Sequence, residues 1–486
     1  MNDVVGVEDA VSFKEQKKQP LYAERIRIYP KAVDGLFRRI KWAVLITLLG
    51  IYYLAPWIRW DRGPGVPDQA LLIDMPSRRA YFFWIEIWPQ EIYYLTGLLL
   101  LGALGLFLAT SIGGRVWCGF TCPQTVWTDL FMWIERRIEG DRGARIRLDK
   151  APWTAEKVAK KSLKHALWLL IAAATGGAWI MYFNDAPTVT KAILTGEASF
   201  AVYFFFGLFT ATTYLLGGIA REQVCTYMCP WPRFQGALLD EYSYVVTYEK
   251  WRGEPRGPYR KGQSWEGRGD CIACNQCVAV CPMGIDIRDG LQLECIGCGL
   301  CIDACNNVME RIGRPRNLIT LDTERNQHLR QRGLPPEHKI IRPRTIVYAT
   351  LIVLLAGAMT LGLSARTTVD VNVLHDRNPL FVTLSDGSVR NGYTIKILNK
   401  EHEPRRYELR LEGIDGARLT VIGQDAEQVE TVELEARPDG VTTYRLYVTV
   451  PGAALTDDAL PLTMVLRDPQ RGVQAEHESV FRGPKR

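Results

Sequence analysis

Apolar residues along this chain are gathered into long uncharged stretches instead of being spread evenly. Five stretches of 17 to 21 residues contain no Asp, Glu, Lys or Arg. They are Trp42–Ile58, Ile92–Ile112, Ala166–Phe183, Phe200–Ala220 and Thr345–Leu363. A helix needs about 20 apolar residues to cross the hydrocarbon core of a bilayer. The pattern therefore predicts a membrane protein with five transmembrane helices.

The distribution of Lys and Arg between these stretches predicts their orientation. Nine such residues lie in the first 41 positions and eleven in 113–165, but only four in 59–91 and one in 184–199. Positively charged loops stay on the cytoplasmic side. We therefore expect a multi-pass protein of the cytoplasmic (inner) membrane, with its N-terminus in the cytoplasm and its C-terminus in the periplasm.

Beyond Leu363 apolar and polar residues alternate with a period of two, which is typical of half-buried strands. Turn pairs such as Asp415-Gly416 and Asp439-Gly440 punctuate the runs. The predicted strands are Tyr393–Leu398, Tyr407–Leu411, Arg418–Ile422, Thr431–Ala436, Thr443–Val450 and Leu460–Leu466. About seven short strands in this length predict an immunoglobulin-like β-sandwich. The region has no cysteine, so the usual inter-sheet disulfide is missing.

All twelve cysteines lie between Cys118 and Cys305. Eight of them form two Cys-x2-Cys-x2-Cys-x3-Cys runs, the spacing by which two-cluster ferredoxins hold paired [4Fe–4S] clusters. The fourth cysteine of each run serves the neighbouring cube. The predicted ligands are Cys271, Cys274, Cys277 and Cys305 for cluster 1, and Cys281, Cys295, Cys298 and Cys301 for cluster 2.

Two other readings of these eight cysteines are disfavoured. A structural zinc site uses different spacings, and disulfides do not persist in a reducing cytoplasm. The polar segment around the runs cannot bury much core, so metal ligation would supply much of its folding free energy.

These patterns divide the chain into five predicted parts. They are a cytoplasmic N-terminal segment (1–41), four transmembrane helices (42–220), a cytoplasmic ferredoxin-like domain (221–344), a fifth transmembrane helix (345–363) and a periplasmic β-sandwich (364–486).

The remaining four cysteines form two Cys-x3-Cys-Pro pairs, Cys118/Cys122 and Cys225/Cys229, each after an apolar stretch. The pairs are 107 residues apart, as are the stretches before them, which indicates an internal duplication. If all four cysteines converge, they could hold a third iron–sulfur cluster or a copper ion. The remaining reading is that they are inert buried thiols.

The formal net charge of +6 is explained by the orientation signal and requires no nucleic-acid partner. The basic runs Arg136-Arg137 and Arg142–Lys150 could also contact anionic lipid.

The ordered combination of motifs resembles the cytochrome c oxidase accessory protein family known as CcoG, FixG or RdxA, over nearly the whole chain. The residues that carry the resemblance, besides the two ferredoxin runs, are Tyr29-Pro30, Trp117–Gln124, Cys225–Trp231, Asp376–Leu380 and Asn391-Gly392-Tyr393. One departure is Asn306 after the second run, where Pro282 follows the first.

The resemblance implies a role in assembling the cbb3-type haem–copper oxidase, as a cupric reductase that yields Cu(I). We expect a cytoplasmic donor to reduce the ferredoxin clusters, which pass single electrons to copper at or near Cys118, Cys122, Cys225 and Cys229. Expected partners are membrane lipid, copper ion, oxidase subunits or assembly factors, and a second copy of the chain.

Two alternatives stay open. In one, the protein is a quinol-linked electron-transfer polyferredoxin. In the other, the clusters are structural and the β domain is a docking module that scaffolds oxidase assembly.

Overall fold

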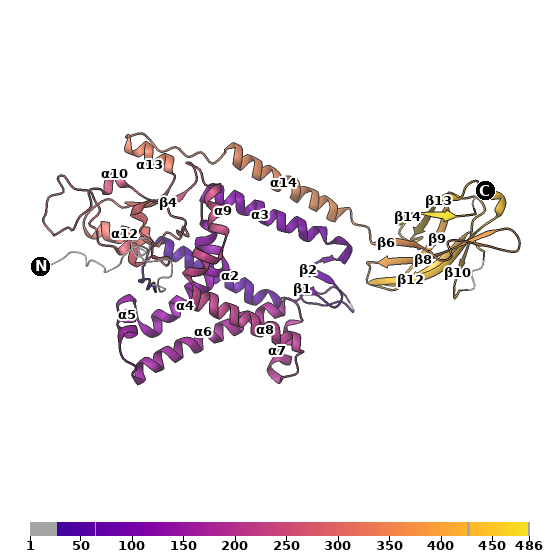
Figure 1. Cartoon of the computed structure of the whole chain (residues 1–486), viewed down its shortest axis with the longest axis horizontal. Helices are drawn as coiled ribbons and strands as arrows, with labels where there is room; N and C mark the ends of the chain where they lie inside the picture. The colour runs from indigo at the N-terminus through magenta and orange to yellow at the C-terminus, as the bar shows by residue number, and fades with distance from the viewer. Residues whose placement is uncertain (1–26, 64, 425–427, 485–486) are drawn as a thin grey trace. The chain divides into compact units, whose positions relative to one another are not determined.

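The computed structural model describes residues 27–63, 65–424 and 428–484. The chain folds as two compact units, which divide between Met359 and Thr360, with the short segment Asp61–Pro67 assigned to the second unit. The larger contains the helices and all cysteines, and the smaller contains the β-sandwich (Figure 1). Residues 1–26 of the predicted N-terminal segment lie outside the described residues.

Five helical segments are long and apolar enough to cross a membrane, and they coincide with the five predicted stretches. These are Leu36–Trp57, Pro89–Gly113, Ala155–Met181, Phe200–Ala220 and Pro343–Ser364. They contain α2 (Leu36–Leu54), α3 (Tyr93–Gly113), α6 (Ala155–Met181), α8 (Phe200–Thr213) with a π-helical turn (Tyr214–Ala220), and α14 (Pro343–Ser364).

Two of these helices begin earlier than predicted, because ion pairs neutralise the charges in their first turns. In α2, Arg38 and Lys41 lie 2.9 and 3.6 Å from the carboxylate of Asp129. In α6, Lys161 and Lys164 each lie 2.9 Å from Glu139. Charge-free stretches therefore mark only the apolar part of each helix.

The apolar helices pack closely where small residues meet. A side chain at Gly176 in α6 would lie 2.7 Å from Thr210 Oγ1 in α8, so these two helices approach at backbone distance (Figure 1). Gly97 of α3 similarly receives Met359 of α14. The shorter helices are α4 (Pro123–Glu139), α5 (Arg142–Lys150), α7 (Ala186–Thr195), α9 (Trp231–Leu238), α10 (Lys250–Gly253) and α13 (Glu324–Gln331).

The connection after α2 forms a three-stranded antiparallel sheet that the sequence analysis did not predict. Its strands are β1 (Leu71–Asp74), β2 (Arg79–Phe82) and β3 (Ile85–Ile87). Each strand has only three or four residues, too few for a clear alternation.

The ferredoxin-like segment has little regular structure. Its elements are the antiparallel strands β4 (Val245–Tyr248) and β5 (Ile319–Asp322) and the helices α11 (Gln276–Ala279) and α12 (Leu300–Arg311). Its core mixes cysteines with aliphatic residues such as Ile302, Val308 and Leu318. Most of this segment therefore consists of loops, several of which carry cysteines.

The C-terminal unit is a sandwich of two antiparallel sheets, as predicted. One sheet has the order β10-β12-β8-β6 with β7 on β8, and the other has the order β11-β9-β13-β14. The strands are β6 (Val369–His375), β7 (Val382–Thr383), β8 (Val389–Asn399), β9 (Arg405–Glu412), β10 (Arg418–Val421), β11 (Thr431–Ala436), β12 (Gly440–Val450), β13 (Ala459–Arg467) and β14 (Gln474–Arg482). All six predicted strands occur, and β6, β7 and β14 are additional.

The motif Asn391-Gly392-Tyr393 has a structural role in this sandwich. Asn391 is fully buried, and its side chain donates to Arg482 O at 2.8 Å. Tyr393 donates to Val480 O at 2.9 Å. These bonds join β8 of one sheet to β14 of the other without a disulfide.

Candidate metal centres

The structure brings together the four cysteines predicted for cluster 1. Cys271, Cys277 and Cys305 are buried in one apolar core, with Cys274 packed against it. Burial raises the pKa of Cys305 to about 12, and its nearest interacting thiols are Cys271 and Cys274. The last cysteine of the second run therefore joins the first three of the first run.

The other four cysteines form the complementary set. Burial raises the pKa of Cys281 to about 12, and its interacting thiols are Cys298 and Cys295. Cys301 interacts with the same three, and with Cys277 of the first set. The two sets are thus neighbours and meet at Cys277 and Cys301.

The loops that carry the two runs have the same backbone conformation. Ala273 and Asn275 have positive φ angles of 53° and 55°, and Gly297 and Gly299, each 24 positions later, have 70° and 72°. Such residues turn backbone N–H groups toward one side of a loop. Gly297 N–H accordingly points at Cys295 Sγ, 3.4 Å away.

The sulfur atoms are not gathered as tightly as a single tetrahedral ion requires. Such an ion, with metal–sulfur bonds of about 2.3 Å, needs sulfur atoms roughly 3.8 Å apart. Among the cysteines, all of which lie in the described residues, no three sulfur atoms come within 4.8 Å of one another. An iron–sulfur cube, with one thiolate at each corner, does not require that close spacing.

Both Cys-x3-Cys-Pro pairs lie in the same unusual turn. Residues Trp117–Thr121 and Val224–Met228 each form a single π-helical turn. Cys122 N–H donates to Trp117 O at 2.8 Å, and Cys229 N–H donates to Val224 O at 2.8 Å. Isolated π turns are rare and are frequent at functional sites. The duplication seen in the sequence therefore extends to the backbone.

The residue that leads into each turn is also duplicated in conformation. Gly114 has φ 59° and ψ −119°, and Arg221, 107 positions later, has φ 44° and ψ −111°. This region is costly for any residue with a side chain. Arg221 is retained there by its ion pair with the buried Glu135, at 3.0 Å, and by its hydrogen bond to Gly218 O.

The four cysteines of the two pairs converge. Burial raises the pKa of Cys118 to about 12, and Cys122, Cys225 and Cys229 are among the thiols that raise it further. Burial likewise raises the pKa of Cys225 to about 12, and the thiols of Cys122 and Cys229 raise it further. Metal binding would have to displace these protons. Only Cys229 of the four is exposed.

Arg115 links this third set of cysteines to the second. Its buried guanidinium donates to the carbonyl oxygens of Cys295, at 2.8 Å, and Pro232, at 2.9 Å, and also to that of Leu293. The charge interacts with the thiols of both Cys295 and Cys118. One cation therefore lies between the two candidate cluster sites.

Gly119, inside the first π turn, lies directly on the loop of the second ferredoxin run. A Cβ at this position would lie 2.9 Å from Ile296 O and 3.1 Å from Cys298 N. Only a glycine permits this backbone contact. This contact places the segment that carries Cys118 against the segment that carries Cys298.

Sequence reasoning missed Arg115, Gly119, Arg221 and the buried Gln235, whose side-chain oxygen accepts from Cys118 Sγ at 3.1 Å. The 107-residue offset was an available signal for Arg221, because it aligns this residue with a glycine. No comparable signal existed for Gln235, which lies six positions beyond Cys229, the second cysteine of its pair.

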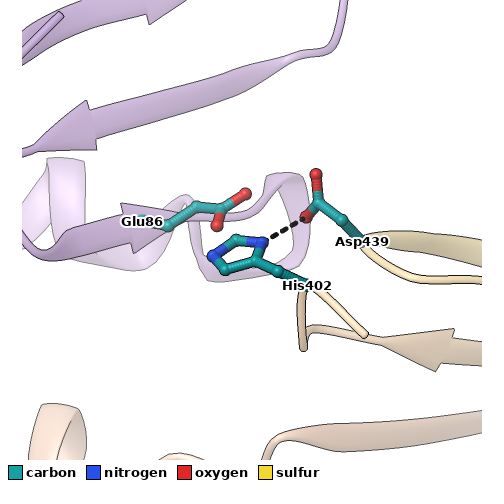
Figure 2. Close-up of side chains that lie close together, drawn as sticks. All are labelled: Glu86, His402 and Asp439. Atoms are coloured by element: carbon teal, nitrogen blue, oxygen red, sulfur yellow. Dashed lines mark ion pairs between the residues drawn. The ribbon is translucent and has the colours of Figure 1, made fainter. Parts of the chain in front are cut away.

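In the β-sandwich, a histidine and a carboxylate from two loops lie near each other. His402 Nδ1 lies 4.0 Å from Asp439 Oδ1 (Figure 2). Both residues are at turns, and Asp439 N–H also donates to Glu401 O at 2.7 Å. These two loops of the sandwich therefore lie close together.

Three protein families match parts of the chain. Residues 220–324 match a 4Fe-4S dicluster domain, and residues 95–140, which include Cys118 and Cys122, match a 4Fe-4S binding domain. Residues 359–484 match the IG-like fold at the C-terminal of FixG. The families agree with the cysteine geometry in indicating iron–sulfur clusters.

Several curated proteins are similar to the chain. Nitrogen fixation protein FixG of Rhizobium meliloti is 49% identical, over 96% of this chain and 94% of its own length. Protein RdxA of Cereibacter sphaeroides is 48% identical, over 96% of this chain and 99% of its own. The ferredoxin-type protein NapH of Escherichia coli is 21% identical over 56% of this chain and 89% of its own. The identity and coverage of the first two show that the chain belongs to the FixG/RdxA family of iron–sulfur electron-transfer proteins.

Proposed function

We propose that the protein is a membrane-bound cupric reductase, which reduces Cu(II) to Cu(I) for assembly of a cbb3-type oxidase. One electron from a cytoplasmic one-electron donor converts one Cu²⁺ to Cu⁺, and no bond to the ion other than thiolate ligation is required. The observation that carries the proposal is that the three cysteine sets adjoin one another in series. The first and second sets meet at Cys277 and Cys301, and the second and third sets are connected by Arg115 and Gly119.

The match of residues 95–140, which include Cys118 and Cys122, to a 4Fe-4S binding domain supports a third iron–sulfur cluster at Cys118, Cys122, Cys225 and Cys229. Bound [4Fe–4S] clusters supply one-electron storage at each set of cysteines. The protein's own residues hold the sets in contact, and Cys229 is the most accessible of the cysteines. Copper is then the substrate, which meets the chain at the exposed side of Cys229, and soft thiolates favour Cu(I).

The same proposal includes the placement of the chain. The five apolar helices cross the inner membrane, the cysteines face the cytoplasm, and the β-sandwich lies in the periplasm. The excess of Lys and Arg in residues 1–41 and 113–165 supports this orientation. The sandwich is then available to oxidase subunits, assembly factors or a second copy of the chain.

The test compares the anaerobically purified protein with the double variant Cys118→Ala/Cys225→Ala. We expect the variant to contain about four fewer iron atoms per chain and to lose Cu(II) reduction by a chemically reduced sample. The control is Thr226→Ala, which lies between the cysteines of the second pair and hydrogen-bonds only to Glu222 O among the described residues.

Unchanged iron content and unchanged copper reduction in the double variant would contradict the proposed role of these cysteines. Oxidation of a quinol by the isolated protein would favour a quinol-linked electron-transfer subunit instead. Redox-silent clusters together with intact oxidase assembly would favour a scaffold.

A further inference from the structure

A cavity of about 380 Å³ lies beside the segments that carry Cys281 and Cys301. It is bounded by the first turns of α2, the C-terminal half of α4 and residues 30–34. Its apolar wall is formed by Val280 and Pro282, which flank Cys281, and by Leu300, which precedes Cys301. The opposite wall carries guanidinium groups and two indole rings.

The guanidinium groups of this wall lack their full complement of partners. Arg38 is 6% exposed; its Nη1 donates to Asp129, but its buried Nη2 has no hydrogen-bond partner in residues 27–63, 65–424 and 428–484. The side chain of Arg136 forms no hydrogen bond or ion pair within the described chain. Arg137 lies over the ring of Trp133, 5.4 Å from its centre.

Three carboxylates line the cavity together with its cations. Asp129 is shared by Arg38 and by Lys41, which lies outside the lining. Asp141 accepts a hydrogen bond from Ala32 N–H at 2.9 Å, and both Asp129 and Asp141 attract the charge of Arg136. The lining therefore carries a net positive charge, with the four cations Lys31, Arg38, Arg136 and Arg137 against the three anions Asp34, Asp129 and Asp141.

The position of the cavity indicates what kind of anion fits. Trp42 belongs to the first apolar helix, Leu36–Trp57, and packs edge-to-face on Trp133 with ring centres 6.0 Å apart. Tryptophan is enriched at membrane–water interfaces, and basic pockets between helices on the cytoplasmic side bind anionic headgroups. Indole rings and guanidinium groups at the start of a membrane helix match a phosphate attached to an acyl chain.

We infer that this cavity, lined by Arg38, Arg136 and Arg137, binds the phosphate of an anionic phospholipid headgroup. The inference does not depend on copper reduction or on the third cluster. A free phosphate ion offers the same chemistry, so the experiment must separate the two sources.

The test is native mass spectrometry of the full-length, cluster-loaded protein in a mild detergent. The delipidated protein is titrated with short-chain phosphatidylglycerol, with phosphatidylcholine of the same chain length, and with inorganic phosphate. The test variant is Arg136→Gln/Arg137→Gln. The matched control is Arg147→Gln/Lys150→Gln, which removes the same charge from exposed positions of α5 outside the cavity.

We expect the native protein and the control to bind one phosphatidylglycerol at least about tenfold more tightly than the test variant, because each basic residue contributes substantially to binding an anionic headgroup. Phosphatidylcholine should bind more weakly to all three proteins. Iron content equal to that of the native protein shows that the test variant is folded, and the exposed single variant Arg137→Gln should show a smaller loss of the same kind.

Equal binding of phosphatidylglycerol by the native protein and a folded test variant would overturn the inference. Displacement of the lipid by millimolar inorganic phosphate, with no preference for phosphatidylglycerol, would overturn the assignment to lipid and identify a free-phosphate site.

Discussion

The two Cys-x3-Cys-Pro repeats have the same backbone but different surroundings. Both have a positive-φ residue, a π turn and an equivalent hydrogen bond that the backbone N–H of the second cysteine donates. In the first repeat the turn is followed by α4 with 17 residues and packs on the ferredoxin loop. In the second it is followed by α9 with eight residues and leaves Cys229 exposed.

The charges next to the two turns are opposite. Arg115 of the first repeat is at the position of Glu222 in the second, 107 residues later. Arg115 interacts with Cys118 and Cys295, and Glu222 interacts with Cys225. The shared backbone positions four thiols. The differing side chains make the first repeat the side that faces the ferredoxin cysteines, and the second repeat the outer side.

The largest expected difference between the repeats is in the iron content that remains after one cysteine of either repeat is replaced. Cys118→Ser should abolish the third cluster, with a loss of about four irons per chain, because Cys118 is less accessible than Cys229 and solvent replaces it less readily. Cys229→Ser should retain part of this iron, since water can reach the exposed corner. Iron analysis and electron paramagnetic resonance measure both. Equal losses would mean that the two halves are equivalent.

A smaller effect is expected from Gly114→Ala. The new Cβ would collide with Tyr244 O, in a backbone region with φ 59°. We expect a destabilisation of about 3 kcal/mol, from strain and overpacking together. The thermal midpoint of cluster bleaching should fall by roughly 5–10 °C. Gly113→Ala, which would meet only the side chain of Val116 at 3.3 Å, is the control, and an equal fall for both variants would contradict the argument.

The contact with the ferredoxin loop distinguishes Gly119 from Thr226, which has the equivalent position in the second repeat. Gly119→Ala should destabilise the protein by about 1–3 kcal/mol, because the new methyl group meets backbone atoms that cannot move aside. It should also slow electron transfer between the second and third sets. Thr226→Ala should change stability by less than about 1 kcal/mol. Stopped-flow reduction and thermal bleaching test both, and identical behaviour would remove the distinction.

The smallest effects should come from the charges and should have opposite signs. Arg115→Gln removes a cation, so the reduced third cluster loses stabilisation and its potential should fall. Glu222→Gln removes an anion, so the potential should rise. An interaction of about 1 kcal/mol corresponds to roughly 40 mV for one electron. Spectroelectrochemical titration measures both shifts, and shifts of the same sign would refute the assigned asymmetry.

Part of this arrangement could be predicted from the sequence because it depends on local spacing. Runs of uncharged residues predicted five long helices, and the x2-x2-x3 spacing predicted which cysteines of the two runs come together. The 107-residue repeat predicted that the Cys-x3-Cys-Pro pairs are related. The ends of α2 and α6 were less predictable, because ion pairs with the distant residues Asp129 and Glu139 allow charged turns to remain helical.

The amino-acid sequence by itself determined the soft-metal chemistry, the apolar helices and the alternating strands, since each depends on residues that are close in the chain. Only the tertiary structure decided that Arg115 lies between Cys118 and Cys295, that Gly119 touches Cys298, and that Arg136 lines a cavity. These contacts join residues up to about 180 positions apart. No periodicity or motif records them, because they arise when separate elements pack against one another.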